Sequence, residues 1–255
     1  MKPKLTLVGA GPGDPELISL KGMRALNMAD VVLYDALAHP DLLDHCKKNA
    51  VKVFVGKRAG MHSYQQEQIN QLIVDYALSG NHVVRLKGGD PFIFGRGREE
   101  IEYAEALGIE TDAIPGISSI NLPGYYGISL THRGINESFW VITSVTSKGT
   151  LSEDVKLAAK TNATVVLLMG LKKLNEIVSV FREAGKDELP VAVISKGSLP
   201  EGSVLIGKVN DVAHKVKESR LQAPALIVLG EVVGPGSEFR KEARWLGAEL
   251  LNTDG

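Results

Sequence analysis

The chain has 255 residues, of which 44% are hydrophobic and 23% are charged, and its formal net charge is −1. This composition is typical of a globular protein with one large or two small domains. The single cysteine excludes an internal disulfide, and the histidines lack metal-ligand spacing, so we expect no metal. The balanced charge argues against a nucleic-acid partner. No apolar run approaches the ~20 residues of a membrane helix, so we expect no membrane partner and a cytoplasmic location.

The first half of the chain alternates between strand and helix patterns. Apolar runs predict strands over 5–8, 31–34, 51–55, 82–86 and 109–114. Helical spacing predicts helices over 17–28, 69–77 and 99–107. Ser19 is a possible N-cap of the first helix, and Ser63 with Gln66 forms a capping-box pattern before the second. Gly80 and Gly108 are predicted helix stops.

A glycine-rich loop joins the first strand to the first helix. Its glycine spacing begins like a dinucleotide fingerprint, but Asp14 stands where the last glycine should be and Pro12 stiffens the loop. This weakens a nicotinamide-binding interpretation without excluding it. Asp35 still supports that interpretation, because it ends the second strand about where an acidic residue would hold a ribose.

The most informative stretch covers residues 83–100 and reads VVRLKGGDPFIFGRGREE. An apolar run ends in Gly88, Gly89 and Asp90, which predicts a buried strand that leads into a sharp ligand-binding turn. Four cations surround the turn: Arg85, Lys87, Arg96 and Arg98. In a chain with almost no net charge, this density suggests an acidic ligand. The alternative is a tight turn followed by a solvated helix start.

The pattern restarts after Pro115 and Gly116, which predicts a domain boundary there. Strands are predicted over 139–143, 164–169, 191–195, 204–206 and 225–229, and helices over 152–160, 174–184 and 209–219. We therefore expect domains over 1–114 and 115–236, followed by a helical tail over 237–255.

Several motifs occur in a fixed order along the chain, among them VGAGPGDPELISLKG, VVRLKGGDPFIFGRG, PGISS, GISLTHRG and APALIVLGEVV. Together they resemble the tetrapyrrole methylase family from Leu5 to about Val233. The resemblance implies an α/β fold of two domains, each a mixed sheet flanked by helices, with an active-site cleft between them. It also implies S-adenosylmethionine as methyl donor and a homodimer. The implied acceptor is uroporphyrinogen III, methylated on two ring carbons to precorrin-2 for sirohaem or cobalamin synthesis.

The resemblance assigns roles to individual residues. Asp35 would accept a proton and Lys57 would donate one, although a turn residue and an exposed surface charge are the alternatives. The donor-binding positions fall on Pro12, Gly88, Gly89, Asp90, Ile93, Ser118, Ser119, Met169, Gly197 and Ala225. Arg85, Lys87, Arg96 and Arg133 would bind the carboxylates of the acceptor.

Some of these positions have alternatives, and so has the activity. Met169 closes an apolar run and could instead pack in a core, and Ser118 and Ser119 could instead cap a helix. A sibling methylase acting later in corrin synthesis would share the fold and the donor. A nicotinamide-dependent oxidoreductase is the alternative from another class of enzyme.

Overall fold

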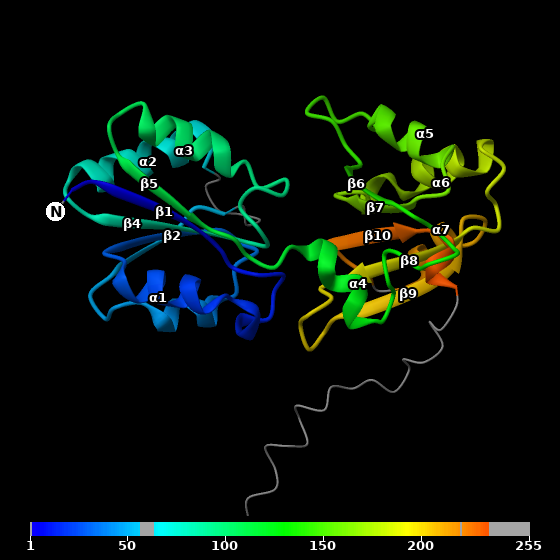
Figure 1. Cartoon of the computed structure of the whole chain (residues 1–255), viewed down its shortest axis with the longest axis horizontal. Helices are drawn as coiled ribbons and strands as arrows, with labels where there is room; N and C mark the ends of the chain where they lie inside the picture. The colour runs from blue at the N-terminus through cyan, green and yellow to red at the C-terminus, as the bar shows by residue number, and fades with distance from the viewer. Residues whose placement is uncertain (1, 57–63, 220, 235–255) are drawn as a thin grey trace, which may run out of the picture. The chain divides into compact units, whose positions relative to one another are not determined.

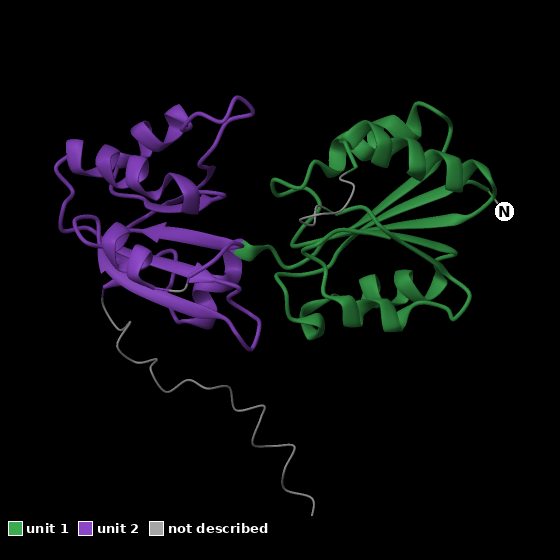
Figure 2. Cartoon of the chain, turned by 180° about the vertical axis from the view of Figure 1, so that it is seen from behind, with its two compact units in different colours: residues 1–119 green, residues 120–255 purple. Residues whose placement is uncertain are grey.

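The chain folds into two compact units, Met1–Ser119 and Ile120–Gly255 (Figure 2). The computed structural model describes residues 2–56, 64–219 and 221–234. The division falls a few residues beyond the boundary expected after residue 114, within the run that contains Pro115 and Gly116. The helical tail expected over 237–255 lies outside the described residues.

Unit 1 is built on a parallel sheet of five strands in the order β3-β2-β4-β1-β5 (Figure 1). The strands are β1 Lys4–Gly9, β2 Val31–Tyr34, β3 Val51–Phe54, β4 His82–Lys87 and β5 Glu110–Ile114. The helical elements are η1 Pro15–Leu17, α1 Leu20–Met28, η2 Pro40–His45, α2 Gln66–Leu78 and α3 Gly97–Glu105. The expected mixed sheet is therefore parallel throughout here, because every connection between described strands is a crossover that passes over a face of the sheet.

Side chains alternate between the two faces of the first sheet. Val83 packs with α2 and α3, whereas Val84 packs with α1 and η2. Figure 1 shows α2 and α3 on one side of the sheet and α1 on the other. Both faces of the sheet are thus covered, and sheets of this kind bind ligands at the carboxyl ends of their strands.

Unit 2 contains the mixed sheet that was expected, in the order β6-β7-β10-β8-β9. Its strands are β6 Phe139–Thr143, β7 Thr164–Leu168, β8 Pro190–Ser195, β9 Ser203–Lys208 and β10 Ala225–Leu229. η3 Ser119–Asn121 begins at the last residue of unit 1, and the other helical elements are α4 Leu122–Tyr125, α5 Glu153–Ala159, η4 Leu171–Lys173, α6 Leu174–Glu183, α7 Val212–Glu218 and η5 Glu231–Val233. β6 and β7 are parallel, whereas β10 runs antiparallel to β7 and β8, and β9 runs antiparallel to β8.

Two local predictions differ from the structure. The first helix begins at Leu20 and not at residue 17, because the Ser19 hydroxyl accepts a hydrogen bond from the Gly22 amide and caps the helix there. The capping box of α2 is formed by Gln65 and Gln68, not by the predicted pair. Ser63 of that pair lies outside the described residues.

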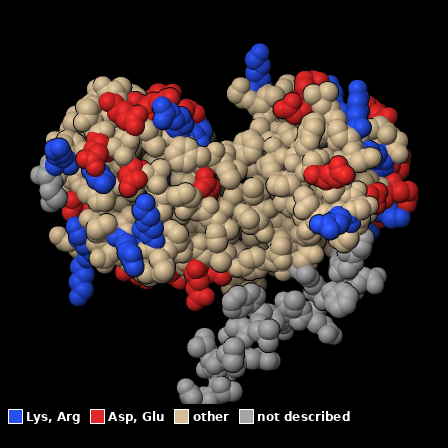
Figure 3. All heavy atoms as spheres, viewed as in Figure 1, with Lys and Arg blue, Asp and Glu red and all other residues tan. Residues whose placement is uncertain are grey.

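Charges of both signs are spread over the surface of each unit. On the face shown in Figure 3, lysine and arginine side chains are interspersed with aspartate and glutamate among the described residues. In the part of the chain that the structure describes, no helix is long and apolar enough to span a membrane.

Candidate functional site

The carboxyl ends of three strands of unit 1 lie close together, and the backbone of glycine residues makes the contacts between them. Gly9 ends β1, Gly89 follows β4 and Gly116 follows β5. A Cβ atom on Gly116 would lie 2.3 Å from the Gly89 carbonyl oxygen and 2.7 Å from the Gly9 Cα. Gly89 also has a φ of +68°, which favours glycine. There is therefore no room for side chains where these three strand ends meet, and main-chain groups line the carboxyl edge of the sheet.

This edge lies beside the switch point of the sheet. β2 and β4 are neighbours, but the chain leaves β2 toward β3 on one side and leaves β4 toward β5 on the other, so their connections diverge. In the loops after β1 and β4, Gly11 and Gly89 exchange two backbone hydrogen bonds, with N to O distances of 3.3 and 2.7 Å. Open α/β sheets bind ligands in the crevice outside the strand ends at such a point.

Asp90 fixes the glycine turn through both of its carboxylate oxygens. Oδ1 accepts a hydrogen bond from the Phe92 amide at 2.8 Å, and Oδ2 accepts one from the Gly116 amide at 3.1 Å. The carboxylate therefore ties the loop after β4 to the loop after β5. Each oxygen has a second acceptor site that a ligand donor could use.

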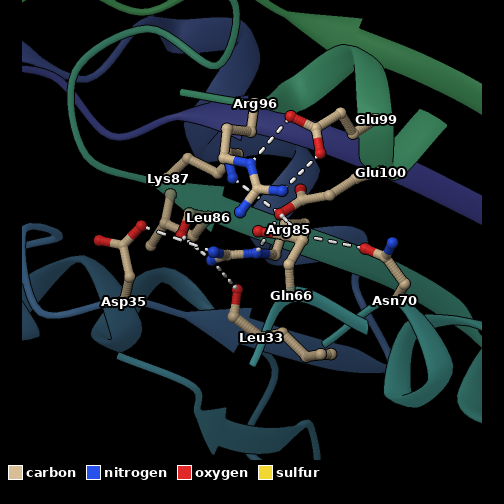
Figure 4. A network of polar contacts seen from close by, with 10 residues as sticks. All are labelled: Leu33, Asp35, Gln66, Asn70, Arg85, Leu86, Lys87, Arg96, Glu99 and Glu100. Carbon is tan, nitrogen blue, oxygen red and sulfur yellow. Dashed lines mark hydrogen bonds and ion pairs between the residues drawn. The ribbon is translucent and has the colours of Figure 1, made fainter. Parts of the chain in front are cut away.

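A cluster of charged side chains is buried behind the edge, between β4 and the helices α2 and α3 (Figure 4). Arg85 and Lys87 occupy alternate positions of β4 and point to the same face as Val83. Glu100 Oε1 lies 2.8 Å from Lys87 Nζ and 3.4 Å from Arg85 Nε. All three residues are at most 5% exposed. Gln66 donates a further hydrogen bond to Glu100 Oε1 at 3.1 Å.

Burial lowers the pKa of Lys87, and the neighbouring charge of Arg85 lowers it further. The carboxylate of Glu100 acts in the opposite direction. Arg85 and Lys87 were predicted to bind the carboxylates of the acceptor. In the structure both side chains are buried and are paired with Glu100. We therefore assign neither cation a direct contact with a ligand.

Asp35 lies at the end of β2, beside this cluster. Its Oδ1 accepts a hydrogen bond from the Leu37 amide at 3.0 Å, and its Oδ2 lies 3.6 Å from Arg85 Nη2. The side chain is 23% exposed, so one part faces the buried cluster and another remains accessible. The predicted partner in proton handling, Lys57, lies outside the described residues.

The remaining predicted cations are exposed. Arg96 forms an ion pair with Glu99 in the first turn of α3, and both side chains are about half exposed. Arg133 lies in an exposed loop of unit 2 before β6. The Arg96 side chain can turn toward a solvent-borne anion at little cost, since exposed ion pairs contribute little to stability.

The predicted donor-binding residues of unit 1 lie along the glycine edge. Pro12 belongs to the loop after β1, and Ile93 is 38% exposed in the loop after the turn. Gly88 is required because a Cβ there would lie 2.3 Å from Leu37 Cβ. Ser118 is buried, and Ser119 begins η3, after the loop that contains Gly116.

The predicted donor-binding residues of unit 2 also share one sheet edge. Met169 follows β7, Gly197 lies just after β8, and Ala225 begins β10. Because β10 runs antiparallel to both neighbours, its start lies beside their ends. Met169 is 58% exposed with a φ of +58°, so the alternative that it packs in a core is wrong.

Sequence reasoning missed Glu100, which organises the buried cluster. The sequence contained a signal for it, because Glu100 falls on the buried stripe of α3 with Gly97, Ile101 and Ala104. A carboxylate on such a stripe needs buried cations, and β4 supplies two. Among the described residues, no group of three or more His, Cys, Asp or Glu side chains could hold a metal ion.

Comparisons with known proteins agree with this arrangement. The profile of the tetrapyrrole (corrin/porphyrin) methylases matches residues 4–213. The uroporphyrinogen-III C-methyltransferase of Methanocaldococcus jannaschii is 44% identical over 91% of this chain and 98% of its own length. The siroheme synthase of Psychrobacter sp. (strain PRwf-1) is 42% identical over 97% of this chain, which spans only 50% of that protein.

Solved structures give the same result. The crystal structure of uroporphyrin-III C-methyl transferase from Thermus thermophilus complexed with S-adenyl homocysteine has a TM-score of 0.78 at 36% identity, over 90% of this chain and 98% of that one. A cobalt precorrin-4 methyltransferase has a TM-score of 0.81 at 27% identity, over 91% and 96%. The glycine edge, the two-unit architecture and these likenesses lead to one conclusion: the chain belongs to the tetrapyrrole (corrin/porphyrin) methylase family.

Proposed function

We propose that this chain is an S-adenosylmethionine-dependent methyltransferase that converts uroporphyrinogen III to precorrin-2 by methylating two ring carbons. The observation that carries the proposal is the glycine edge of unit 1, where three strand ends pack backbone to backbone and the main chain of Gly88 and Gly89 stays partly exposed beside the switch point of a parallel sheet. Relatives that span nearly the same length are named for this activity, and one was crystallised with S-adenyl homocysteine.

The residues present fit an adenosyl methyl donor. Gly88, Gly89 and Asp90 would approach it from unit 1, because both glycines are partly exposed without side chains and the carboxylate has acceptor sites to spare. The family resemblance assigns further donor contacts to Met169, Gly197 and Ala225, which gather at one sheet edge of unit 2. The donor supplies the electrophilic methyl group, and the chain must align it with the ring carbon.

Proton transfer is the second task of the chain. When the ring carbon takes the methyl group, the carbon–sulfur bond breaks with its electrons on sulfur, and the ring must later lose a proton. Asp35 is proposed as the acceptor of that proton, since its carboxylate lies at a strand end and remains partly exposed. Lys57 is proposed as a proton donor on the family resemblance alone. A homodimer in the cytoplasm belongs to the same proposal and rests on the same resemblance.

The structure argues against a nicotinamide enzyme. In dinucleotide-binding folds the glycine loop leads directly into a helix whose N-terminus faces the pyrophosphate. Here the loop after β1 leads into η1 Pro15–Leu17, and α1 begins only at Leu20. The second candidate is a methylase that acts on a later corrin intermediate, which the likeness to cobalt precorrin-4 methyltransferase favours.

The deciding experiment is an anaerobic reaction of the protein with uroporphyrinogen III and S-adenosylmethionine, followed by mass spectrometry of the product. We expect two added methyl groups, with a monomethylated intermediate at early times. Asp35→Asn and Lys57→Met should lower kcat by ~10²–10⁴-fold, the usual contribution of a positioned acid or base. An unmethylated product in the presence of normal donor binding would redirect the assignment to a later intermediate.

A further inference from the structure

The buried cluster behind Asp35 carries unequal numbers of positive and negative charges. Arg85 and Lys87 contribute two cations, and Glu100 is the carboxylate among the described residues that is buried with them. The next carboxylate in contact is Asp35, through Arg85 Nη2 at 3.6 Å. Glu100 therefore balances one of the two cations. The second is balanced only when the carboxylate of Asp35 is counted with the cluster.

Arg85 is also held in one orientation. Its Nη1 donates hydrogen bonds to the carbonyl of Leu86 at 2.9 Å and to that of Leu33 at 3.4 Å, which belong to β4 and β2. Its Nε lies against Glu100. Because the guanidinium is planar and rigid, these contacts fix the direction of Nη2. Figure 4 shows the guanidinium between Glu100 and Asp35.

Asp35 receives a matching pair of contacts, with the Leu37 amide on Oδ1 and Arg85 on Oδ2. At 3.6 Å the second contact is electrostatic and not a hydrogen bond. We infer that Arg85 is a positioning residue for methyl transfer, which aligns the carboxylate of Asp35 from behind without touching either substrate. This inference rests on the proposed function, because it requires Asp35 to act on the reacting ring.

A double-mutant cycle tests whether Arg85 acts through Asp35. The variants are Arg85→Gln, Arg85→Lys, Asp35→Asn and the Asp35→Asn/Arg85→Gln pair, with Arg24→Gln as the control. Arg24 is an exposed arginine of α1 on the other face of the sheet. The measurements are single-turnover methyl transfer to uroporphyrinogen III, calorimetric binding of S-adenosylhomocysteine, and near-ultraviolet circular dichroism as a check of folding.

We expect Arg85→Gln to slow methyl transfer about 10-fold or more, a fraction of the ~10²–10⁴-fold that a positioned acid or base contributes. Donor binding should stay within about threefold of the wild type, because the side chain of Arg85 contacts Leu33, Leu86, Asp35 and Glu100 and not the glycines of the edge. Arg85→Lys keeps the charge but lacks the planar guanidinium, so it should recover only part of the rate. In the Asp35→Asn background, Arg85→Gln should add almost nothing, since coupled residues give non-additive losses.

Two results would overturn the inference alone: a wild-type rate in Arg85→Gln, or losses that multiply in the double variant. If Arg85→Gln does not fold, the cycle is run with Arg85→Lys. If Arg85→Lys then slows methyl transfer by the same factor in the Asp35→Asn background as in the wild type, the inference is overturned. A wild-type protein that methylates nothing would overturn the proposed function, and the inference with it.

Discussion

Replacing Glu100 by glutamine removes one charge from a site that solvent does not reach. Glu100 Oε1 lies 2.8 Å from Lys87 Nζ and 3.4 Å from Arg85 Nε, and the glutamate side chain is 0% exposed. Removing one partner of a buried ion pair costs ~3–5 kcal/mol, because it leaves a buried charge uncompensated. Glutamine keeps the size and one acceptor oxygen, so we expect a loss of about 3 kcal/mol in the unfolding free energy of unit 1.

The loss should depend on pH through Lys87. Burial and the charge of Arg85 already hold the pKa of Lys87 below its unfolded value of 10.5, and Glu100 opposes them. Without Glu100, the pKa of Lys87 in the folded state falls further. Between the folded and unfolded values, the unfolded chain binds more protons, so stability rises with pH. The penalty of Glu100→Gln should therefore be largest at neutral pH and shrink as the pH rises toward 10.5.

Amide hydrogen exchange read by mass spectrometry measures this locally. Peptides that contain β4 should lose protection, and those that contain β7 should not. The matched control is Glu102→Gln, which removes an exposed carboxylate of the same helix and should change nothing measurable. Wild-type protection of β4 in Glu100→Gln would refute the reasoning.

Three further predictions concern the glycine edge. Gly116→Ala places a Cβ 2.3 Å from the Gly89 carbonyl oxygen, so it should lower the Tm and abolish donor binding in calorimetry, whereas Gly124→Ala, with nothing within 4 Å, should leave both unchanged. Asp90→Ala removes the acceptor of two backbone amides and should weaken donor binding ~10-fold or more with little change in far-ultraviolet circular dichroism. Asp90→Asn should retain part of the affinity. If Asp90→Ala binds the donor as tightly as the wild type does, Asp90 does not have this role. The protein should bind S-adenosylhomocysteine and not NAD, and the reverse result in titration calorimetry would remove the donor assignment.

Strand positions could be predicted well from the sequence. The strands Val31–Tyr34, Phe139–Thr143 and Ala225–Leu229 match the expected ranges at both ends. Each is an apolar run bounded by polar, glycine or proline residues, so local pattern alone defines its ends. Short elements were missed: η2 Pro40–His45 and α4 Leu122–Tyr125 contain too few turns for a periodic signal.

The contacts of charged residues could be predicted less well. Arg85 and Lys87 alternate with apolar residues on β4, and the sequence was interpreted as presenting both to a ligand. Whether a cation on a strand meets solvent or a helix depends on which helix covers that face. That information is tertiary, and it is supplied here by α3, whose Glu100 reaches the strand.

The central position of β10 in the second sheet has a consequence for the order in which the chain can fold. β10 is the last strand in sequence, yet it separates β7 from β8. Until residues 225–229 have left the ribosome, the β6-β7 pair and the β8-β9 hairpin each have an unpaired edge. Unit 1 has all its strands once Ile114 is made. At synthesis rates of ~5–20 residues per second, unit 1 has several seconds to fold before the second sheet can close.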